Sequence, residues 1–220
     1  RDTGKVFETT LKDFKEKTVS DVSLANLIKT IWSSSRKEVI SLFYYPNGVN
    51  YRYFNYKTRS SAELGSSIKS LVFSPDGSQI AYFGTKEKER GIFISQPDGS
   101  SFKKLFSTRL ENVQIYWPSA GVLAFKAETG DGSELYSLSK TGELEKTLDA
   151  KKELEVRWSE SGSGLLFSQN TSSGISLFYK NISSGEEIPL GVSTSASKCV
   201  WGIDEKSVVC GVPKSSASGD

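Results

Sequence analysis

Phe73-Ser74-Pro75-Asp76-Gly77-Ser78-Gln79-Ile80-Ala81-Tyr82 is the stretch that decides the fold. Pro75 presets the backbone of a type I turn, Asp76 suits its second position, and Gly77 supplies the left-handed conformation that closes a hairpin. The apolar residues on either side recur with a period of two, which is typical of strands and not of helices. The stretch therefore predicts two antiparallel strands joined by a tight turn.

The aromatic residue that opens this stretch recurs along the chain at spacings of 41, 44, 41 and 43 residues. The series consists of Trp32, Phe73, Trp117, Trp158 and Trp201. Each member is followed by a short polar turn and then by an apolar strand. Because the aromatic recurs in every repeat, whereas a binding site is usually made once, we expect these side chains in the core and not on a ligand platform.

Each repeat carries two further strand patterns, at residues 92–94 and 102–106 in the repeat of Phe73. The turn between them is Pro97-Asp98-Gly99, and its counterparts are Lys140-Thr141-Gly142 and Ser183-Ser184-Gly185. Four antiparallel strands in roughly 40 to 45 residues are the period of a β-propeller blade. We expect an all-β propeller with four complete and two half blades, a single propeller domain or fragment over residues 1–213, and a polar tail over 214–220.

The two half blades lie at the ends of the sequence. Residues 4–9 and 14–19 match third and fourth strands, whereas 198–201 and 207–212 match first and second strands. Either the halves combine into one blade and close a five-bladed ring, or the chain is part of a larger propeller. The chain has no Met, so Arg1 is not expected to be a translation start, which favours the second alternative.

Composition excludes several classes of function. The chain has 28 basic and 26 acidic residues, a net charge of +2, so we expect no nucleic-acid partner. No apolar run reaches the roughly 18 residues of a spanning helix, so we expect no membrane insertion by this segment, although an anchor outside it is compatible with the sequence. The absence of His removes the Ser/His/Asp and Cys/His nucleophile arrangements.

The acidic residues give little support to an enzyme. Asp76, Asp98 and Asp204 lie in predicted turns, where Asp bonds to the local backbone. Asp131-Gly132-Ser133-Glu134 is nearest to a calcium loop but lacks alternating ligands, so it is expected to be a turn. We predict no catalytic residues, no cofactor and no metal site.

The aromatic-Ser-Pro-Asp-Gly turn at 73–77, followed by an apolar strand, resembles the signature of the TolB-type propeller repeat. Only this repeat carries the signature whole, whereas the others keep the aromatic and a small polar turn. The resemblance implies a WD-repeat-like propeller that serves as an interaction platform in the bacterial envelope, or as the non-catalytic propeller beside a serine-peptidase domain.

The last repeat also resembles bacterial surface propellers with a Cys-Val-Trp strand paired to a strand that ends in Cys. Here these are Cys199-Val200-Trp201 and Val208-Val209-Cys210. Pairing of the two strands brings the cysteines near disulfide range, which is consistent with an oxidising compartment. The alternative is that Cys199 and Cys210 are two small buried thiols.

One charge run, Lys86-Glu87-Lys88-Glu89-Arg90, joins two strands of its blade and is typical of a solvated loop tip. In a propeller such loops, together with the links between blades, line the face where partners generally bind. The candidates for this partner face are Lys86, Arg90, Arg109, Glu111, Glu128 and Asp131.

Residues 43–56 are unusually aromatic and put rings on both faces of two strands, with a hairpin turn at Asn47-Gly48. Tyr44, Tyr51 and Tyr53 are candidates for stacking on a sugar. Packing between neighbouring blades explains the same rings without a ligand and is the favoured interpretation.

The sequence therefore predicts a non-catalytic scaffold for protein–protein interaction in the bacterial cell envelope, in the periplasm or at the cell surface. One alternative is the propeller portion of a multidomain serine peptidase or hydrolase whose catalytic domain lies outside this chain. A second alternative is carbohydrate binding through the three tyrosines.

Overall fold

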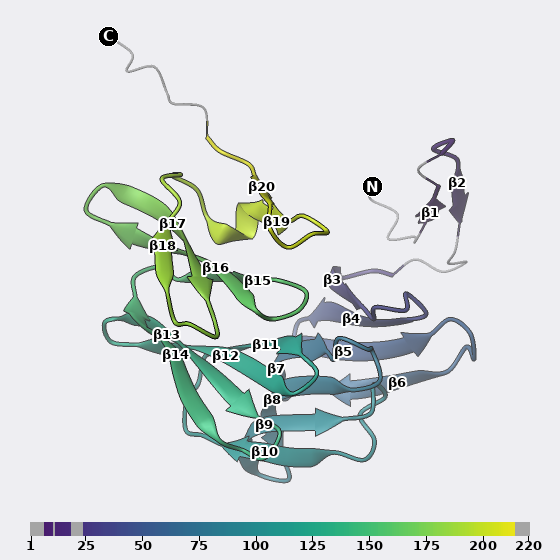
Figure 1. Ribbon diagram of the computed structural model, residues 1–220. Coiled ribbons are helices and arrows are strands. Elements are labelled where there is room, and N and C mark those ends of the chain that lie inside the picture. Colours follow the sequence, from purple (N-terminus) through teal and green to yellow (C-terminus); the bar gives the residue numbers. More distant parts are fainter. Residues whose placement is uncertain (1–6, 11, 19–23, 214–220) are drawn as a thin grey trace. The chain divides into compact units, whose positions relative to one another are not determined.

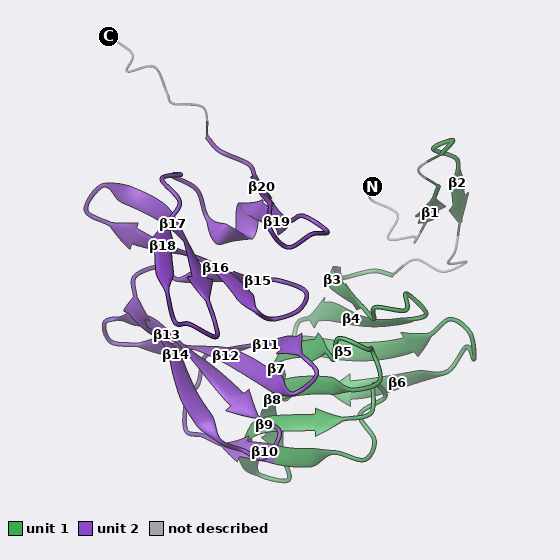
Figure 2. Ribbon diagram, in the orientation of Figure 1, with its two compact units in different colours: residues 1–104 green, residues 105–220 purple. Residues whose placement is uncertain are grey.

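The computed structural model describes residues 7–10, 12–18 and 24–213, and its regular structure is almost all strand (Figure 1). Contacts divide the chain into two compact units, residues 1–104 and 105–220, with the boundary inside β10 (Figure 2). The predicted positions 4–6, 19 and 214–220 lie outside the described residues. Four of the six sheets have four antiparallel strands, as the repeat predicts.

The first unit begins with a two-stranded sheet, β1 (Phe7–Thr9) and β2 (Glu16–Thr18). Its first complete sheet consists of β3 (Leu27–Trp32), β4 (Glu38–Tyr45), β5 (Gly48–Asn55) and β6 (Ser61–Gly65). The second consists of β7 (Ile68–Phe73), β8 (Ile80–Lys86), β9 (Glu89–Ser95) and β10 (Lys103–Ser107).

In the second unit, the third complete sheet consists of β11 (Val113–Ser119), β12 (Val122–Thr129), β13 (Gly132–Ser139) and β14 (Leu144–Lys151). The fourth consists of β15 (Glu155–Trp158), β16 (Gly164–Thr171), β17 (Gly174–Asn181) and β18 (Glu187–Pro189). A short helix η1 (Ala196–Lys198) precedes the two-stranded sheet of β19 (Cys199–Trp201) and β20 (Val208–Cys210). How the two-stranded sheets are completed stays a prediction.

Packing between consecutive sheets forms the core of the first unit. Ile40, Tyr51 and Tyr53 of the first sheet bury their side chains with Phe73 and Tyr82 of the second. Burial of each such side chain stabilises the fold by about 1.5–3 kcal/mol. The hydroxyl of Tyr53 donates to the Glu38 carboxylate at 2.6 Å, so its polar end is satisfied, and burial raises the pKa of Tyr53 to about 12.

The second unit shows the same arrangement twice. Leu165 and Phe167 of β16 belong to the cluster shared with the third sheet, whereas Leu166, between them, belongs to the cluster shared with β19 and η1. Because side chains alternate between the faces of a strand, the fourth sheet is buried on both faces.

Four of the five repeating aromatics are buried or partly buried in the core. Phe73 and Trp117 are buried, and Trp158 and Trp201 are partly buried against the adjacent clusters. The prediction is wrong for Trp32, whose side chain is 43% exposed and stacks on Tyr56 with 5.6 Å between ring centroids. The reason is that Phe73, Trp158 and Trp201 pack against residues of the sheet before their own, whereas Trp32 belongs to the first complete sheet.

The turn after the aromatic is built on a buried serine. Ser74 Oγ accepts from the Gln79 backbone N–H at 3.0 Å and donates to Asp76, and Gly77 has a φ of +76°. Hydrogen bonds from Ser74 and Ser78 lower the pKa of Asp76 to about 2. The corresponding serines in the first and fourth sheets, Ser33 and Ser159, are also buried and accept from the backbone five residues on.

These turns also contact the turn of the preceding sheet. A Cβ at Gly77 would lie 3.2 Å from Ser33 Cβ, and a Cβ at Gly162 would lie 3.1 Å from the Pro118 carbonyl oxygen. Glu205 accepts from the Ser161 backbone N–H at 2.6 Å. Small residues and short polar bonds in the turns therefore set how closely the sheets approach.

The predicted hairpin at Asn47-Gly48 is displaced by one residue. Tyr45 pairs with Gly48, so the turn residues are Pro46 and Asn47. This placement puts Pro at the first central position and Gly at the last position of the turn, which are the positions each favours in a type I turn.

Replacement of Ser159 by Ala tests the serine turn. The Gly164 N–H, which donates to Ser159 Oγ at 3.1 Å in a buried position, would lose its side-chain acceptor, so we expect the free energy of unfolding to fall by about 1–3 kcal/mol. Urea denaturation measures the loss, with Ser172→Ala in the exposed turn at the other end of β16 as the control. Equal stabilities of the two variants would contradict the role of Ser159.

Cys199 and Cys210 lie directly opposite in β19 and β20 and form a disulfide, with 4.1 Å between their Cα atoms. Cys199 is buried among Leu166, Leu177 and Ala196. The bond therefore ties the two-stranded sheet together beside the fourth sheet.

Reduction of this disulfide should destabilise the β19–β20 hairpin by about 2–3 kcal/mol, because the bridge spans a sequence separation of 11. Amide hydrogen exchange, measured with and without reductant, reports the change at β19 and β20. The amides of β3 and β4 serve as the internal control. Unchanged exchange in the hairpin after complete reduction would count against this stabilising role.

Candidate recognition grooves at the link end of the sheets

In each complete sheet, the turn between the second and third strands lies at the same end as the last residue of the fourth strand. From that end the chain continues to the next sheet. We call this the link end. The links bond to the second strand of the following sheet: Tyr44 N–H donates to Asn26 at 2.9 Å and Asn170 N–H donates to Lys152 at 2.8 Å. The link end is therefore held by main-chain bonds that do not depend on side-chain identity.

In the first unit, two predicted partner-face residues lie at the link end of the second sheet. Lys86 and Arg90 flank the turn of Glu87 and Lys88, whose φ values are +51° and +70°. Lys86 Nζ lies 4.9 Å from the centroid of the Phe102 ring, so its ammonium group makes a cation–π contact with a residue just before β10.

The other four predicted partner-face residues lie in the second unit, at the link end of the third sheet. Arg109 and Glu111 occupy the link before β11 and are exposed. Glu128 accepts from Asn112 Nδ2 at 2.8 Å, so the structure brings the end of β12 together with this link. Asp131 is exposed in the turn before β13, as expected of a turn residue.

Over residues 7–10, 12–18 and 24–213, no group of three His, Cys, Asp or Glu side chains is placed to hold a metal ion. The same residues include no helix with the length and hydropathy of a membrane span.

The sugar-stacking hypothesis is wrong for two of its three residues. Tyr51 and Tyr53 are only 5% and 6% exposed, because they lie on the face of the first sheet that packs on the second. Tyr44 is 59% exposed at the link end. Of the three tyrosines, Tyr51 and Tyr53 are therefore core residues, and Tyr44 alone is available to a ligand.

A groove of about 250 Å³ opens at the link end of the first sheet. It is lined by Tyr45, Asn47, Gly48, Val49, Asn50 and Ser66. Asn50 Oδ1 is buried and has no hydrogen-bond partner among the described residues. The groove therefore contains a desolvated acceptor that a ligand could satisfy.

The groove exists because β6 stops short of the end of β5. Pairing of the two strands starts at Tyr51 with Gly65, and Gly65 has a φ of +94°, so the chain turns away there. The Asn55 N–H donates to Ser60 on the β6 side. Because main-chain groups two residues apart point to the same side of a strand, those of Val49 face the groove.

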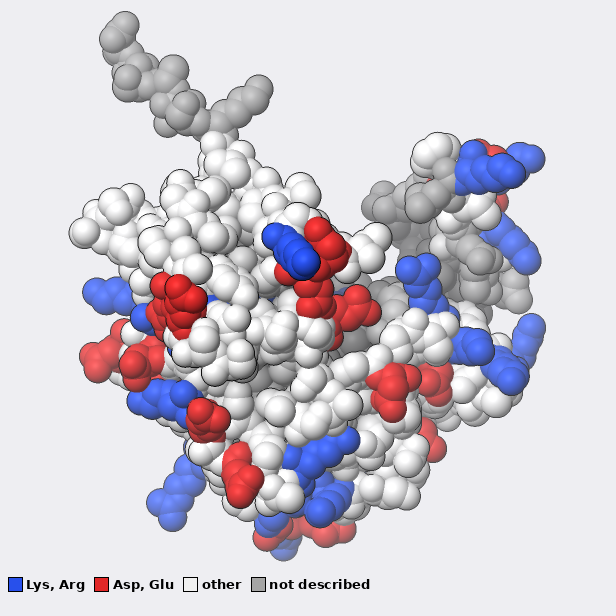
Figure 3. Space-filling view, in the orientation of Figure 1, with Lys and Arg blue, Asp and Glu red and all other residues white. Residues whose placement is uncertain are grey.

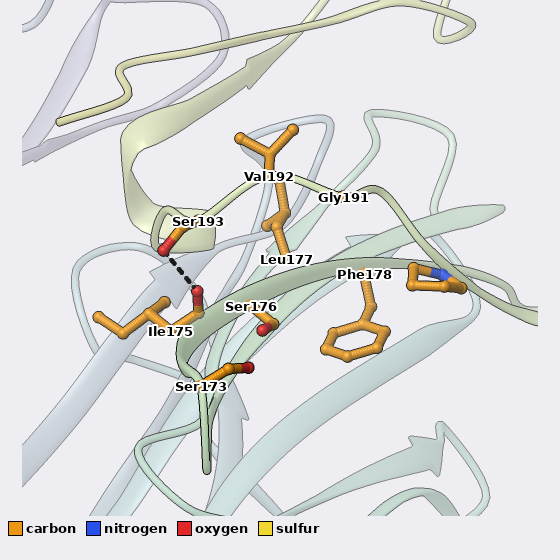
Figure 4. Close-up of a pocket in the computed structure, with 9 residues that line it drawn as sticks. Ser173, Ile175, Ser176, Leu177, Phe178, Gly191, Val192 and Ser193 are labelled. Atoms are coloured by element: carbon orange, nitrogen blue, oxygen red, sulfur yellow. Dashed lines mark hydrogen bonds between the residues drawn. The ribbon is translucent and has the colours of Figure 1, made fainter. Parts of the chain in front are cut away.

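A second groove of about 250 Å³ lies at the link end of the fourth sheet (Figure 4). Here Gly191, with a φ of +67°, interrupts the regular pairing with β17 after Leu190, although Val192 still accepts from the Leu177 N–H. Ser193 Oγ donates to the Ile175 carbonyl at 2.9 Å and so partly closes the strand edge (Figure 4). The surface over the β16–β17 hairpin carries few charges (Figure 3).

In the third sheet, the corresponding edge of the third strand, β13, is occupied by the fourth strand. Its fourth strand continues to Lys151, which pairs with Ser133 of β13. A Cβ at Gly132 would lie 2.4 Å from the Lys151 carbonyl oxygen, whereas a Cβ at Gly48 or Gly174 would meet nothing within 4 Å. An extended segment of main chain therefore fits this place in the repeat.

We predicted neither groove from the sequence, although the sequence contains a signal for both. The first and fourth sheets carry Leu64-Gly65 and Leu190-Gly191 where, by strand register, the third carries Thr147-Leu148. Glycine at this position allows the positive φ that ends the fourth strand early. Alignment of the repeats on their fourth strands, and not only on their aromatics, would have located the open edges.

No family model matches the chain, and no curated protein matches it. Solved structures do. TolB from Acinetobacter baumannii aligns over 89% of this chain and 52% of that chain, with a TM-score of 0.63 and 14% identity. The putative TolB from Agrobacterium tumefaciens aligns over 86% and 74%, with a TM-score of 0.61 and 12% identity.

The acylaminoacyl peptidase of Pyrococcus horikoshii aligns over 84% of this chain and 34% of that chain, with a TM-score of 0.59 and 13% identity. This chain thus spans about half the length of the Acinetobacter TolB chain and a third of the peptidase. At these identities the likeness concerns the fold. The predicted fold class is confirmed: the sheets are those of a β-propeller, similar to TolB and to peptidase propellers.

Proposed function

We propose that this chain is a non-catalytic propeller scaffold that binds a protein partner through the link end of its sheets, outside the cytoplasm. The observation that carries the proposal is the groove of the first sheet, where a strand edge and an unpartnered buried acceptor lie together. The exposed ring of Tyr44 lies at the same end of the sheet, on the strand that pairs with Val49. Exposed aromatic rings and unsatisfied main-chain groups are features that protein partners use.

The location outside the cytoplasm is supported by two observations. The disulfide of Cys199 and Cys210 is of a kind that persists in oxidising compartments. The likeness to TolB structures points in the same direction.

A second candidate is the propeller portion of a multidomain serine peptidase or hydrolase. It is supported by the likeness to the acylaminoacyl peptidase, of which this chain covers a third. The full-length gene separates the two candidates, because a downstream α/β-hydrolase domain with a nucleophile elbow would favour the peptidase and its absence the scaffold.

Site-specific photocrosslinking tests the scaffold. A photoreactive amino acid at Asn47, in the exposed turn at the link end of the first sheet, should capture a discrete protein from an envelope extract of the source organism. The matched control is the same group at Arg36, in the exposed turn at the opposite end of that sheet. Mass spectrometry identifies the captured protein.

Capture at position 47 and not at 36 is the expected result. Capture at position 36 alone, equal capture at both positions, or no capture at either would contradict partner binding at the link end.

A further inference from the structure

We infer that the groove of the first sheet binds an extended peptide segment of the partner. The peptide pairs with the edge of β5 opposite Val49, in line with β6 and beyond the point where β6 ends. The inference rests on the proposed function and names the form of the ligand. Strand addition uses main-chain hydrogen bonds for affinity and alternate side chains for specificity.

The main-chain geometry of β5 supports this form of ligand. The N–H and C=O of Val49 lie on the side of β5 where β6 pairs further along the strand, and β6 ends before it reaches Val49. Gly48 has open space beside it, so no side chain of the strand blocks the approach of a second backbone. A strand edge with these properties accepts another strand.

The third sheet provides an internal template for the occupant. Ser133 stands one residue after the glycine that opens its strand, as Val49 does, and there it pairs with Lys151 at the end of β14. The same place in the repeat is therefore filled by extended main chain in one sheet and open in the other.

The chemistry of the groove restricts the peptide. None of the residues that line the groove is charged, so a charged side chain placed against them would lose hydration without gaining a partner there. Asn50 Oδ1 requires a donor, which a backbone or side-chain N–H or O–H supplies. We expect an uncharged segment of β-forming residues whose side chain opposite Val49 lies on the same face as Tyr44.

The groove of the fourth sheet is the weaker candidate. Ser193 already donates to the Ile175 carbonyl, and Val192 accepts from the Leu177 N–H, so its edge is partly occupied by the chain itself. The inference is therefore confined to the first sheet.

A random octapeptide library, selected on the immobilised protein, tests the inference. Selected peptides should be rich in Val, Ile, Thr and Tyr, and titration should shift the NMR amide signals of Gly48, Val49 and Asn50. N-methylation of alternate peptide residues removes main-chain donors and should weaken binding by about tenfold or more.

Two variants provide a matched pair. Ser66 is exposed and lines the groove, so Ser66→Trp should fill it and weaken binding by about tenfold or more, whereas Ser67→Trp, one residue further along the exposed link, should change it by less than about twofold. NMR spectra of both variants without peptide check that the fold is retained.

Failure to select any peptide above background, shifts confined to other residues, or binding that survives both N-methylation and Ser66→Trp would overturn strand addition. If position 47 still captures a partner in that case, the scaffold stands and only the form of the ligand is wrong. If capture fails as well, both proposals fall.

Discussion

Each complete sheet of this protein is apolar on both faces, and neither face can be left in water. In the second strands of the second, third and fourth sheets, consecutive residues are almost fully buried, as in Leu165, Leu166 and Phe167. Neighbouring residues of one strand point to opposite faces, so this pattern requires a cover on each side. Stacking of similar sheets meets that requirement, and the short serine turns permit the close approach that it needs.

This constraint explains why equivalent residues differ in burial. Trp201 packs on the fourth sheet, where its ring lies 3.1 Å from the position of a Cβ at Gly164 and its indole N–H donates to the Arg157 carbonyl at 3.3 Å. Trp32 has the same place in its repeat but no complete sheet before it in the chain, and it stacks on Tyr56. Burial of the aromatic is thus a property of the pair of sheets and not of the residue.

The sequence allowed the four-stranded repeat and turns such as Pro75-Asp76-Gly77 to be predicted, because these depend on local patterns and on period-two alternation. It offered the disulfide of Cys199 and Cys210 as one of two alternatives, and it misplaced the turn at Asn47-Gly48 by one residue. It did not allow burial to be assigned to single tyrosines. Tyr44 and Tyr51 share one face of the first sheet, and only their distance from its end makes one exposed and the other buried. The grooves were missed because they depend on where a fourth strand stops.

Strand length is the variable through which such a repeat can acquire a binding site without losing its core. The covered faces are fixed by the apolar strands in the middle of each sheet, whereas the last residues of the fourth strand lie at its edge and bury little. In the first sheet Tyr51 pairs with Gly65, where the fourth strand ends, whereas in the third sheet the equivalent Leu135 pairs with Leu148 and the fourth strand continues to Lys151. The core can therefore be kept in every sheet while individual edges are opened or closed.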